Sequence, residues 1–401
     1  MKDFTVILKT IWRSKTSPLL LILQIAVTFT IFVNAVYMVS QKHDKVTAPS
    51  GLNESQVFSL FINLQEKGDA RVAEFEQVIR DIKGLETVDN AIPVTSVPMS
   101  GFGRSVDIGY GPADEDKLTS SGYYGSNFDS RDTLDLELIA GQWFEQSDVS
   151  HSYYGAQPGA KVVVSRALAQ TLHPDNWRDV LGKTLYVQNE PQQVIGVVDN
   201  LKAVWSFWRL FDHVVLSPTF EVHDKVGIMV KAQPGTLEQT MSDVKELLLA
   251  TPGRQIDKLK PFSQTREESY RSDVAELEIL KLVLVGLLVL TMLAIFGQAR
   301  FAILKRRKQI GTRRALGANR VQVLRYYLME NLIVTLVGVA IGVICAVIVN
   351  TQLVSYFGLA PVPAYYLLVG AVIMLSAGQL AVIQPAWQAA HVSPALATRS
   401  V

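Results

Sequence analysis

The sequence predicts a membrane protein with four transmembrane helices and a large α+β domain between the first and the second helix. Three observations support this fold class. Four apolar segments, each with at most one charged residue, are long enough to cross a bilayer, at residues 18–40, 280–299, 328–350 and 364–384. The block at residues 41–280 contains no such segment. The basic residues are concentrated in the connection at residues 300–327.

The basic connection predicts the orientation of the chain. Between Arg300 and Arg325 it carries nine Lys or Arg residues and no Asp or Glu. A short connection of this kind lies on the cytoplasmic side of a membrane. We therefore expect a cytoplasmic N-terminus, a cytoplasmic tail at residues 385–401, and residues 41–280 on the outside. The connection at residues 351–363, which has no charged residue, also belongs outside.

The N-terminal segment and the first span have alternative interpretations. Apolar residues recur at helical spacing within residues 1–17, so we expect an amphipathic helix lying in the headgroup plane in contact with membrane lipid. The alternative is a helix packed on the chain's own spans. The first span could also be a cleaved signal peptide, but its apolar core is long and no clear A-x-A site follows, which favours a retained anchor. Its polar residues Gln24, Thr28, Thr30 and Asn34 are expected to face neighbouring helices.

The outside block reads as two β-α-β units with an insertion between them. The first unit has a strand at residues 56–63, a helix at 70–83 and a returning strand at 87–97, broken by Pro93. The second has a strand at residues 226–231, a helix at 237–249 and a strand at 255–262. Two such units in one layer predict a split α+β sandwich.

The insertion, at about residues 100–222, is expected to be a mostly-β subdomain. Its predicted strands lie at residues 161–165, 184–188 and 193–198, and a short helix is predicted at 166–172.

Two further features concern the helices. The charged helix at residues 264–279 enters the second span without an interrupting Pro or Gly, so one continuous helix is expected there as a stalk. Gly338 and Gly342 form a G-x-x-x-G pair in the third span, which permits close helix approach. Packing within the chain is favoured over a dimer seam, because the pattern is common in apolar helices.

Several function classes are excluded or disfavoured by what the sequence lacks. It has no G-x-x-x-x-G-K-[ST] loop, so we expect no ATP bound by this chain. It has neither H-E-x-x-H nor G-x-S-x-G, and its six histidines show no ligand spacing, so neither a metal site nor an enzyme is expected. The net charge of +1 predicts no nucleic-acid partner. The single cysteine, Cys345, cannot form an internal disulfide.

A family resemblance follows from motifs along nearly the whole chain. The segment Arg307-Lys-Gln-Ile-Gly-Thr-Arg-Arg-Ala-Leu-Gly-Ala318 resembles the R-x-E-I-G-x-x-R-A-x-G-A motif of MacB/FtsX/LolC-type ABC transporter permeases, and Glu330 matches the Glu that opens their next span. Pro385-Ala-Trp-Gln-Ala-Ala-His-Val-Ser-Pro394 resembles their closing segment. In the outside block, residues 138–144, 163–169, 181–184 and 194–198 resemble MacB-like periplasmic stretches in the same order. Gln309 and Gln142 depart from the pattern, which commonly has Glu and Arg there.

The resemblance implies a permease subunit of the bacterial inner membrane that is not itself an enzyme. It implies partnership with an ABC ATPase subunit that binds ATP and Mg, and with a second, identical or paralogous permease chain. A periplasmic adaptor and an outer-membrane channel are further partners of an efflux system. By mechanotransmission, closure of the ATPases would move the periplasmic domains and export peptides, antibiotics or other amphiphiles. A lipoprotein-releasing permease and an FtsX-like regulator of a periplasmic cell-wall hydrolase stay open as alternatives, although FtsX-type domains are usually smaller.

The resemblance also implies the coupling residues. The predicted ATPase-docking set is Arg307, Ile310, Gly311, Arg313, Arg314, Ala315, Leu316, Gly317 and Ala318. In this hypothesis the apolar members form a ridge that docks in an ATPase groove, and the arginines pair with ATPase carboxylates. The alternative for the arginines is a solvated, lipid-facing basic belt without a partner. Pro385, Ala386 and Pro394 are the expected tail motif.

Overall fold

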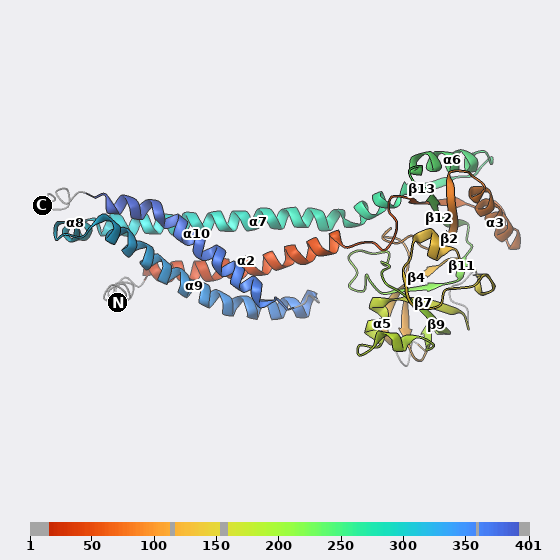
Figure 1. The fold of residues 1–401 in the computed structure, drawn as a ribbon, viewed down its shortest axis with the longest axis horizontal. Helices are drawn as coiled ribbons and strands as arrows, with labels where there is room; N and C mark the ends of the chain where they lie inside the picture. The colour runs from red at the N-terminus through yellow and green to blue at the C-terminus, as the bar shows by residue number, and fades with distance from the viewer. Residues whose placement is uncertain (1–15, 113–116, 153–158, 358–360, 393–401) are drawn as a thin grey trace. The chain divides into compact units, whose positions relative to one another are not determined.

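A computed structural model describes residues 16–112, 117–152, 159–357 and 361–392 of the chain (Figure 1). These fall into two compact units. One is Ala48–Ser272, and the other combines Met1–Thr47 with Asp273–Val401. Within the described ranges, four helices are long and apolar enough to cross a membrane, and an α+β domain separates the first from the second. The predicted fold class is confirmed.

The membrane helices are longer than the apolar runs that predict them. Their bounds are Thr16–Thr47 for α2, Phe262–Lys305 for α7, Arg320–Phe357 for α9 and Ala364–Ala390 for α10. The four predicted spans lie inside these helices, because polar turns continue each helix beyond its apolar part. The helix α7 is continuous across the predicted junction at residue 280. The amphipathic helix predicted for residues 1–17 lies outside the described residues, apart from Thr16 and Ser17, which begin α2.

Two segments predicted as connection and tail are largely helical. Residues 300–327 contain the end of α7, the helix α8 (Arg307–Ala315) and the start of α9. The helix α10 continues beyond the predicted fourth span, through Pro385 to Ala390, so the first residues of the predicted tail are helical. A proline keeps a helical φ and removes one backbone donor. The buried Ala386, Ala389 and Ala390 pack in the core of the helical unit and hold this last part of α10 in place.

The helices α2 and α9 approach closely at two glycines. A Cβ added at Gly338 would lie 2.8 Å from the Cβ of Ile25, and one added at Gly342 would lie 2.9 Å from the Cβ of Phe29. Both distances are shorter than ordinary contacts, so this approach requires glycine at both positions. The G-x-x-x-G pair therefore lies in a helix contact within the chain.

Polar side chains join the same two helices. The Thr30 hydroxyl donates to the Gly342 carbonyl at 3.2 Å, and the Asn34 amide donates to the Ala346 carbonyl at 3.3 Å. The Asn34 amide also donates within α2, to the Thr30 carbonyl at 2.9 Å, and the single proton of the Thr30 hydroxyl is shared with the Ala26 carbonyl at 2.8 Å. These two buried polar residues of α2 thus have partners without water, as lipid requires.

We expect Gly342→Val to destabilise the helical unit by about 1–3 kcal/mol, because the added methyls would overpack the contact with Phe29. The measurement is thermal unfolding of the detergent-solubilised chain. Gly286→Val on α7 is the matched control, since an added Cβ there meets nothing within 4 Å. Equal melting temperatures for the two variants would contradict the α2–α9 contact.

The two predicted β-α-β units share one antiparallel sheet, with the strand order β13-β1-β12-β2. Its elements are β1 (Val57–Asn63), α3 (Asp69–Lys83), β2 (Val88–Val94), β12 (Lys225–Ala232), α6 (Leu237–Leu249) and β13 (Ile256–Pro261). The units interleave, because β12 lies between β1 and β2, and β1 lies between β12 and β13. Apolar side chains of α3 and α6 pack on the strands in a single core.

The break predicted at Pro93 does not occur. Pro93 lies inside β2, opposite Ile228 of β12. Because β2 is an edge strand of this sheet, the missing proline donor interrupts no central ladder.

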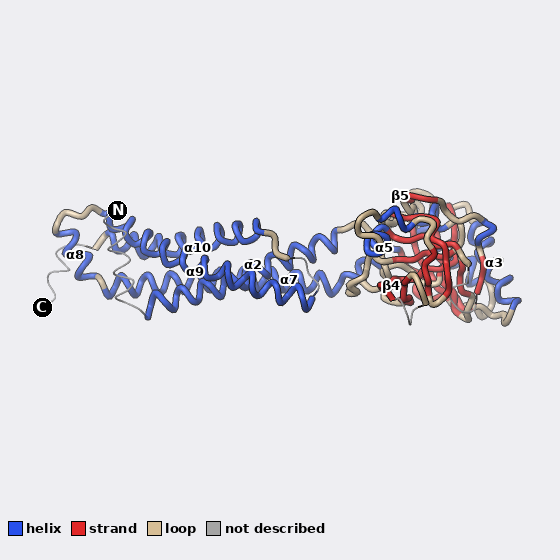
Figure 2. The backbone as a smooth tube through the Cα atoms, turned by 90° about the horizontal axis from the view of Figure 1, so that it is seen from below, coloured by secondary structure: helices blue, strands red, loops and turns tan. Residues whose placement is uncertain are grey.

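The insertion forms the predicted mostly-β subdomain, and its strands close on themselves. The strand order is β5-β9-β7-β10-β4-β3-β8, and β8 also pairs with β9. The bounds are β3 Arg104–Gly109, β4 Lys117–Gly125, β5 Leu138–Gly141, β7 Lys161–Ser165, β8 Thr184–Val187, β9 Glu190–Val198 and β10 Val214–Ser217. The helices are α4 (Ser130–Leu134) and α5 (Arg166–Leu172), and a small pair joins β6 (Ser150–Ser152) to β11 (Thr219–Glu221). Figure 2 shows these strands in red within the large domain.

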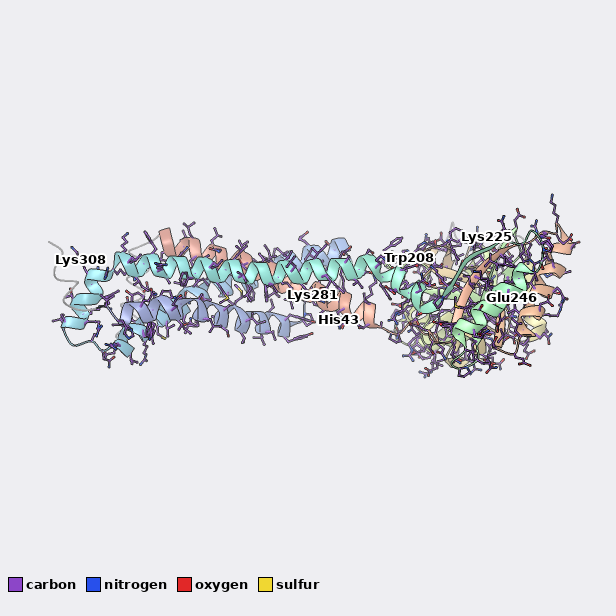
Figure 3. The ribbon with its side chains drawn as sticks, turned by 90° about the horizontal axis from the view of Figure 1, so that it is seen from above. His43, Trp208, Lys225, Glu246, Lys281 and Lys308 are labelled. Atoms are coloured by element: carbon purple, nitrogen blue, oxygen red, sulfur yellow. The ribbon has the colours of Figure 1, made fainter. Side chains whose placement is uncertain are left out.

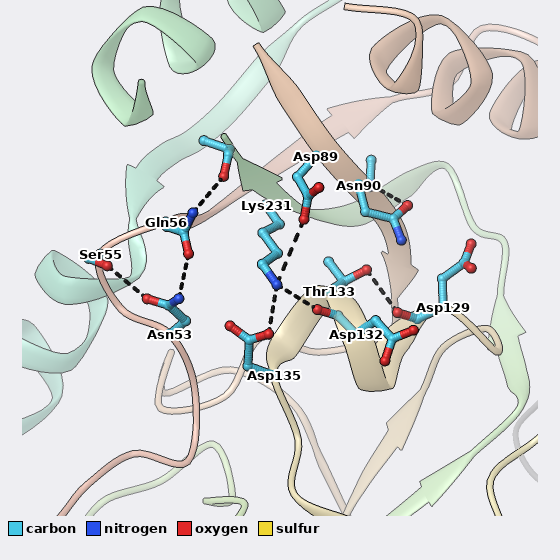
Figure 4. A network of polar contacts seen from close by, with 12 residues as sticks. Asn53, Ser55, Gln56, Asp89, Asn90, Asp129, Asp132, Thr133, Asp135 and Lys231 are labelled. Carbon is cyan, nitrogen blue, oxygen red and sulfur yellow. Dashed lines mark hydrogen bonds and ion pairs between the residues drawn. The ribbon is translucent and has the colours of Figure 1, made fainter. Parts of the chain in front are cut away.

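A lysine on β12 ties the sheet to the insertion. The Lys231 ammonium donates to the Asp132 carbonyl at 2.9 Å and lies 2.6 Å from the Asp135 carboxylate, both at the end of α4 (Figure 4). Lys83 of α3 pairs with Asp129, just before α4, at 2.6 Å. The two halves of the domain are therefore joined by ion pairs as well as by the chain.

Candidate functional site

The predicted coupling segment is a short helix held between two long ones. The helix α8 ends in a Schellman arrangement, in which the Ala318 amide donates to the Arg313 carbonyl and the Gly317 amide to the Arg314 carbonyl, both at 3.1 Å. This turn needs a left-handed residue, and Gly317 has φ of 99°. An added Cβ at Gly317 would meet nothing within 4 Å, so the glycine is required here for its backbone conformation and not for close approach.

The start of α9 is fixed by a reciprocal cap. The Gln322 amide donates to the Asn319 side chain at 2.8 Å, and the Asn319 amide donates to the Gln322 side chain at 3.0 Å. This capping box satisfies two backbone donors that a helix start leaves open. The turn between α8 and α9 is consequently defined at both ends.

The inner face of α8 belongs to the helical core. Ile310 is only 4% exposed and lies in one apolar cluster with Ile303, Val323, Tyr327 and residues of α10. Gly311 is buried as well. The prediction that Ile310 belongs to an outward ridge is therefore wrong. The spacing of a nine-residue helix does not show which face its neighbours cover.

An ion pair to both carboxylate oxygens of one glutamate fixes the N-terminal end of α8. The Arg306 guanidinium lies 2.8 Å and 2.9 Å from the two carboxylate oxygens of Glu330 on α9. Their side chains are 18% and 15% exposed. Burial opposes the charge of Arg306, but the carboxylate of Glu330 outweighs it and raises the pKa of Arg306. This arrangement fixes the angle at which α8 leaves the end of α7.

Arg314 contacts the end of α10 and does not project freely. Its guanidinium donates to the Ala390 carbonyl at 3.0 Å and to the Val392 carbonyl at 2.8 Å. Ala390 is the last residue of α10, where a cation is favoured by the helix dipole, and Val392 lies two residues beyond the helix end. The two predicted motifs, in α8 and at residues 385–390, are thereby brought together. Pro394 lies outside the described residues.

The remaining predicted residues form an exposed surface. Leu316 is 83% exposed, and Arg307, Arg313, Ala315 and Gly317 are exposed around it. Ala318 is half-buried. The Arg313 guanidinium lies 4.9 Å from the centre of the Tyr326 ring, which restrains its position. We call Arg307, Arg313, Ala315, Leu316 and Gly317 the α8 surface. Lys308, on the same helix, is labelled in Figure 3.

Sequence reasoning missed the residues that support this surface. The sequence does contain a signal for the pairing of Glu330 with Arg306. Glu330 is the only Asp or Glu that follows Glu278 in the sequence, and it lies close to the basic run at residues 300–325. A lone acid next to a basic run requires a local counter-charge when it is buried. No comparable signal marks Arg314, since its partners are backbone carbonyls.

Comparisons with known proteins agree with this architecture. The model of the MacB-like periplasmic core domain matches residues 20–247, and that of the FtsX-like permease C-terminal matches residues 281–394. The macrolide export ATP-binding/permease protein MacB of Neisseria gonorrhoeae is 23% identical over 360 residues, which cover 86% of this chain and 52% of that protein. The chain thus spans about half the length of this relative.

A further permease and one solved structure are also similar. The uncharacterized ABC transporter permease YknZ of Bacillus subtilis is 21% identical over 284 residues, covering 67% of this chain and 64% of that protein. The crystal structure of the periplasmic region of MacB from Actinobacillus actinomycetemcomitans has 18% sequence identity and a TM-score of 0.34, covering 56% of this chain and 98% of that chain.

Proposed function

Because this chain belongs to the MacB/FtsX-type family of ABC transporter permeases, we propose that it is the membrane subunit on which an ABC ATPase acts to export peptides, antibiotics or other amphiphiles. Chemistry on ATP and Mg would occur in the ATPase partner. Movement of the large domain, not a path through the bilayer, would drive export. The similar MacB of Neisseria gonorrhoeae is a macrolide export protein, which supports the export class.

The observation that carries this proposal is the construction of the α8 surface. The Leu316 side chain is 83% exposed to solvent. The position of α8, next to Leu316, is fixed by the Arg306–Glu330 pair and by the buried Ile310 side chain. An exposed leucine among cations on a braced helix suits docking to an acidic-rimmed apolar groove. A basic belt that only faced lipid would need no such bracing.

The proposal includes an orientation and further partners. The basic residues of 300–327 favour a cytoplasmic α8 surface and cytoplasmic termini in a bacterial inner membrane, with residues 41–280 in the periplasm. Exposed apolar residues of α7, including Leu282, Val285 and Leu290, would contact lipid or a second permease chain. A periplasmic adaptor and an outer-membrane channel would complete the export route.

The test replaces one exposed side chain. Leu316→Glu is expected to reduce recovery of the ATPase with the affinity-tagged chain in mild detergent at least tenfold, while the melting temperature stays unchanged. The control is Val321→Glu, which alters an equally apolar, 68% exposed residue in the first turn of α9. Arg314→Glu is unsuitable, because it would also break the contact with α10. Full recovery of the ATPase with Leu316→Glu would exclude the α8 surface as its docking site.

A further inference from the structure

The large domain contains a cavity of about 400 Å³ where its sheet meets the mostly-β insertion. Phe61, Val94, Lys225 and Lys258 line it from β1, β2, β12 and β13. Phe102, Arg104, Tyr123, Glu221 and His223 line it from the insertion side. Its size lies in the range of small-molecule sites, and its position between two halves of a domain is typical of them.

One wall of the cavity is apolar. Phe61, Val94 and Val226 present hydrocarbon from the sheet, and Phe102 faces them with 66% of its surface exposed. Gly227 allows this wall to pack closely, because an added Cβ there would lie 2.8 Å from the Val94 carbonyl oxygen and 3.1 Å from the Phe61 ring. The wall is therefore suited to the apolar body of a ligand.

The polar wall is cationic. Arg104, Lys225 and Lys258 line the cavity together with a single carboxylate, that of Glu221. Arg104 pairs with Glu221, and the His223 ring nitrogen lies 3.1 Å from the same carboxylate. Lys225, labelled in Figure 3, pairs with Asp257, and the hydrogen bond from Lys225 lowers the pKa of that carboxyl. These contacts neutralise part of the charge and leave an excess of positive charge.

Lys258 supplies the excess. Among the residues that the structure describes it forms no ion pair at hydrogen-bonding distance, although its charge helps Lys225 to lower the pKa of the Asp257 carboxyl, and its ammonium lies 5.8 Å from the centre of the Phe102 ring. Its backbone is left-handed, with φ of 54°, next to the irregular pairing of β13 with β1 between Ser59 and Phe61. A lysine with a left-handed backbone conformation is strained, and residues strained in this way cluster at ligand-binding and active sites.

We propose that this cavity binds an anionic amphiphile, with its apolar body between Phe61 and Phe102 and its carboxylate or phosphate on Lys258, flanked by Arg104 and Lys225. A cation would meet Lys258 instead of a counter-charge, and a neutral ligand would leave it unused. The proposal that an anionic amphiphile binds here depends only on the geometry and charge of the cavity. The further claim that this ligand is exported rests on the proposed export function.

The experiment measures binding to the full chain in lipid nanodiscs, with empty nanodiscs as the partition blank. Isothermal titration compares decanoate, decyl phosphate, decanol and decyltrimethylammonium. We expect saturable binding of one or both anions, with the preferred anion identifying the headgroup, and at least tenfold weaker binding of the alcohol and the cation. Loss of one charge-assisted contact gives an effect of this size.

Variants locate the site. Lys258→Gln is expected to weaken anion binding about tenfold, and Phe102→Ser is expected to weaken it as well, whereas Lys245→Gln, at an exposed position of α6, is expected to leave it unchanged. Binding no stronger than to empty discs, equal affinity for anion and alcohol, or an unchanged affinity in Lys258→Gln would each overturn the assignment. Leu316→Glu separates the two proposals, because loss of ATPase recovery there should leave anion binding intact.

Discussion

Replacing Glu330 by alanine is expected to destabilise the helical unit by about 3 kcal/mol. The substitution leaves the Arg306 guanidinium, whose side chain is 18% exposed, without the carboxylate that contacts it at 2.8 Å and 2.9 Å. Removing one partner of a buried pair is costly because the remaining charge stays desolvated. Thermal unfolding of the detergent-solubilised chain measures the loss.

The controls for this prediction come from the same chain. Glu278→Ala breaks an exposed pair with Lys281, whose side chains are 67% and 50% exposed, and should cost less than about 1 kcal/mol. The double variant Arg306→Met with Glu330→Met should be more stable than Glu330→Ala, because no charge is then left alone. If Glu330→Ala and the Glu278→Ala control have the same melting temperature, the Arg306–Glu330 pair does not stabilise the position of α8. If Glu330→Ala releases α8, the amount of ATPase recovered with the affinity-tagged variant should also fall.

Asp273→Ala is expected to have the second largest effect, about 2–3 kcal/mol. The Asp273 carboxylate, 10% exposed on α7, lies 2.7 Å from the Lys42 ammonium and 2.9 Å from the Lys45 ammonium on α2. It is the shared counter-charge of two lysines, so its loss sets two like charges against each other. The lysines are themselves 22% and 31% exposed, which lowers the expected cost below that of a fully buried pair.

Hydrogen exchange gives this prediction a local readout. Amides of residues 42–47 should exchange faster in Asp273→Ala, because the end of α2 loses its contact with α7. Glu276→Ala is the matched control, since Glu276 also contacts Lys42, at 2.6 Å, but is 58% exposed. If the two variants exchange and melt alike, Asp273 does not join the helices in the way its geometry indicates.

Local patterns in the sequence predicted the elements well where the determining residues are neighbours. The helix at residues 166–172 was expected at its observed bounds, and it begins where the Ser165 hydroxyl accepts the Leu168 amide at 3.4 Å. The helix at residues 237–249 likewise lies where its apolar spacing places it.

What could not be predicted depends on partners far along the chain. The strands of the insertion close on one another because β8 pairs with β3 as well as with β9. The alternation of apolar residues along the sequence does not show which strands pair. The sequence predicts that Pro93 breaks its strand, because it does not show that this strand lies at the edge of the sheet. The sequence does not show that Ile310 faces inward, because the residues that cover it, such as Ala386 and Ala389, lie on α10.

The bonds between α2 and α9 also set a condition on biosynthesis. Thr30 and its acceptor, Gly342, are separated by 312 residues in the chain, as are Asn34 and Ala346. At roughly 5–20 residues per second, the first helix therefore waits in the bilayer for about 15–60 s before its partner is made. Throughout that interval Thr30 and Asn34 can still donate to carbonyls one turn earlier in their own helix. These two donors of the nascent anchor are thus satisfied within its own helix, and its hydrogen bonds to the third span form only after that span is made.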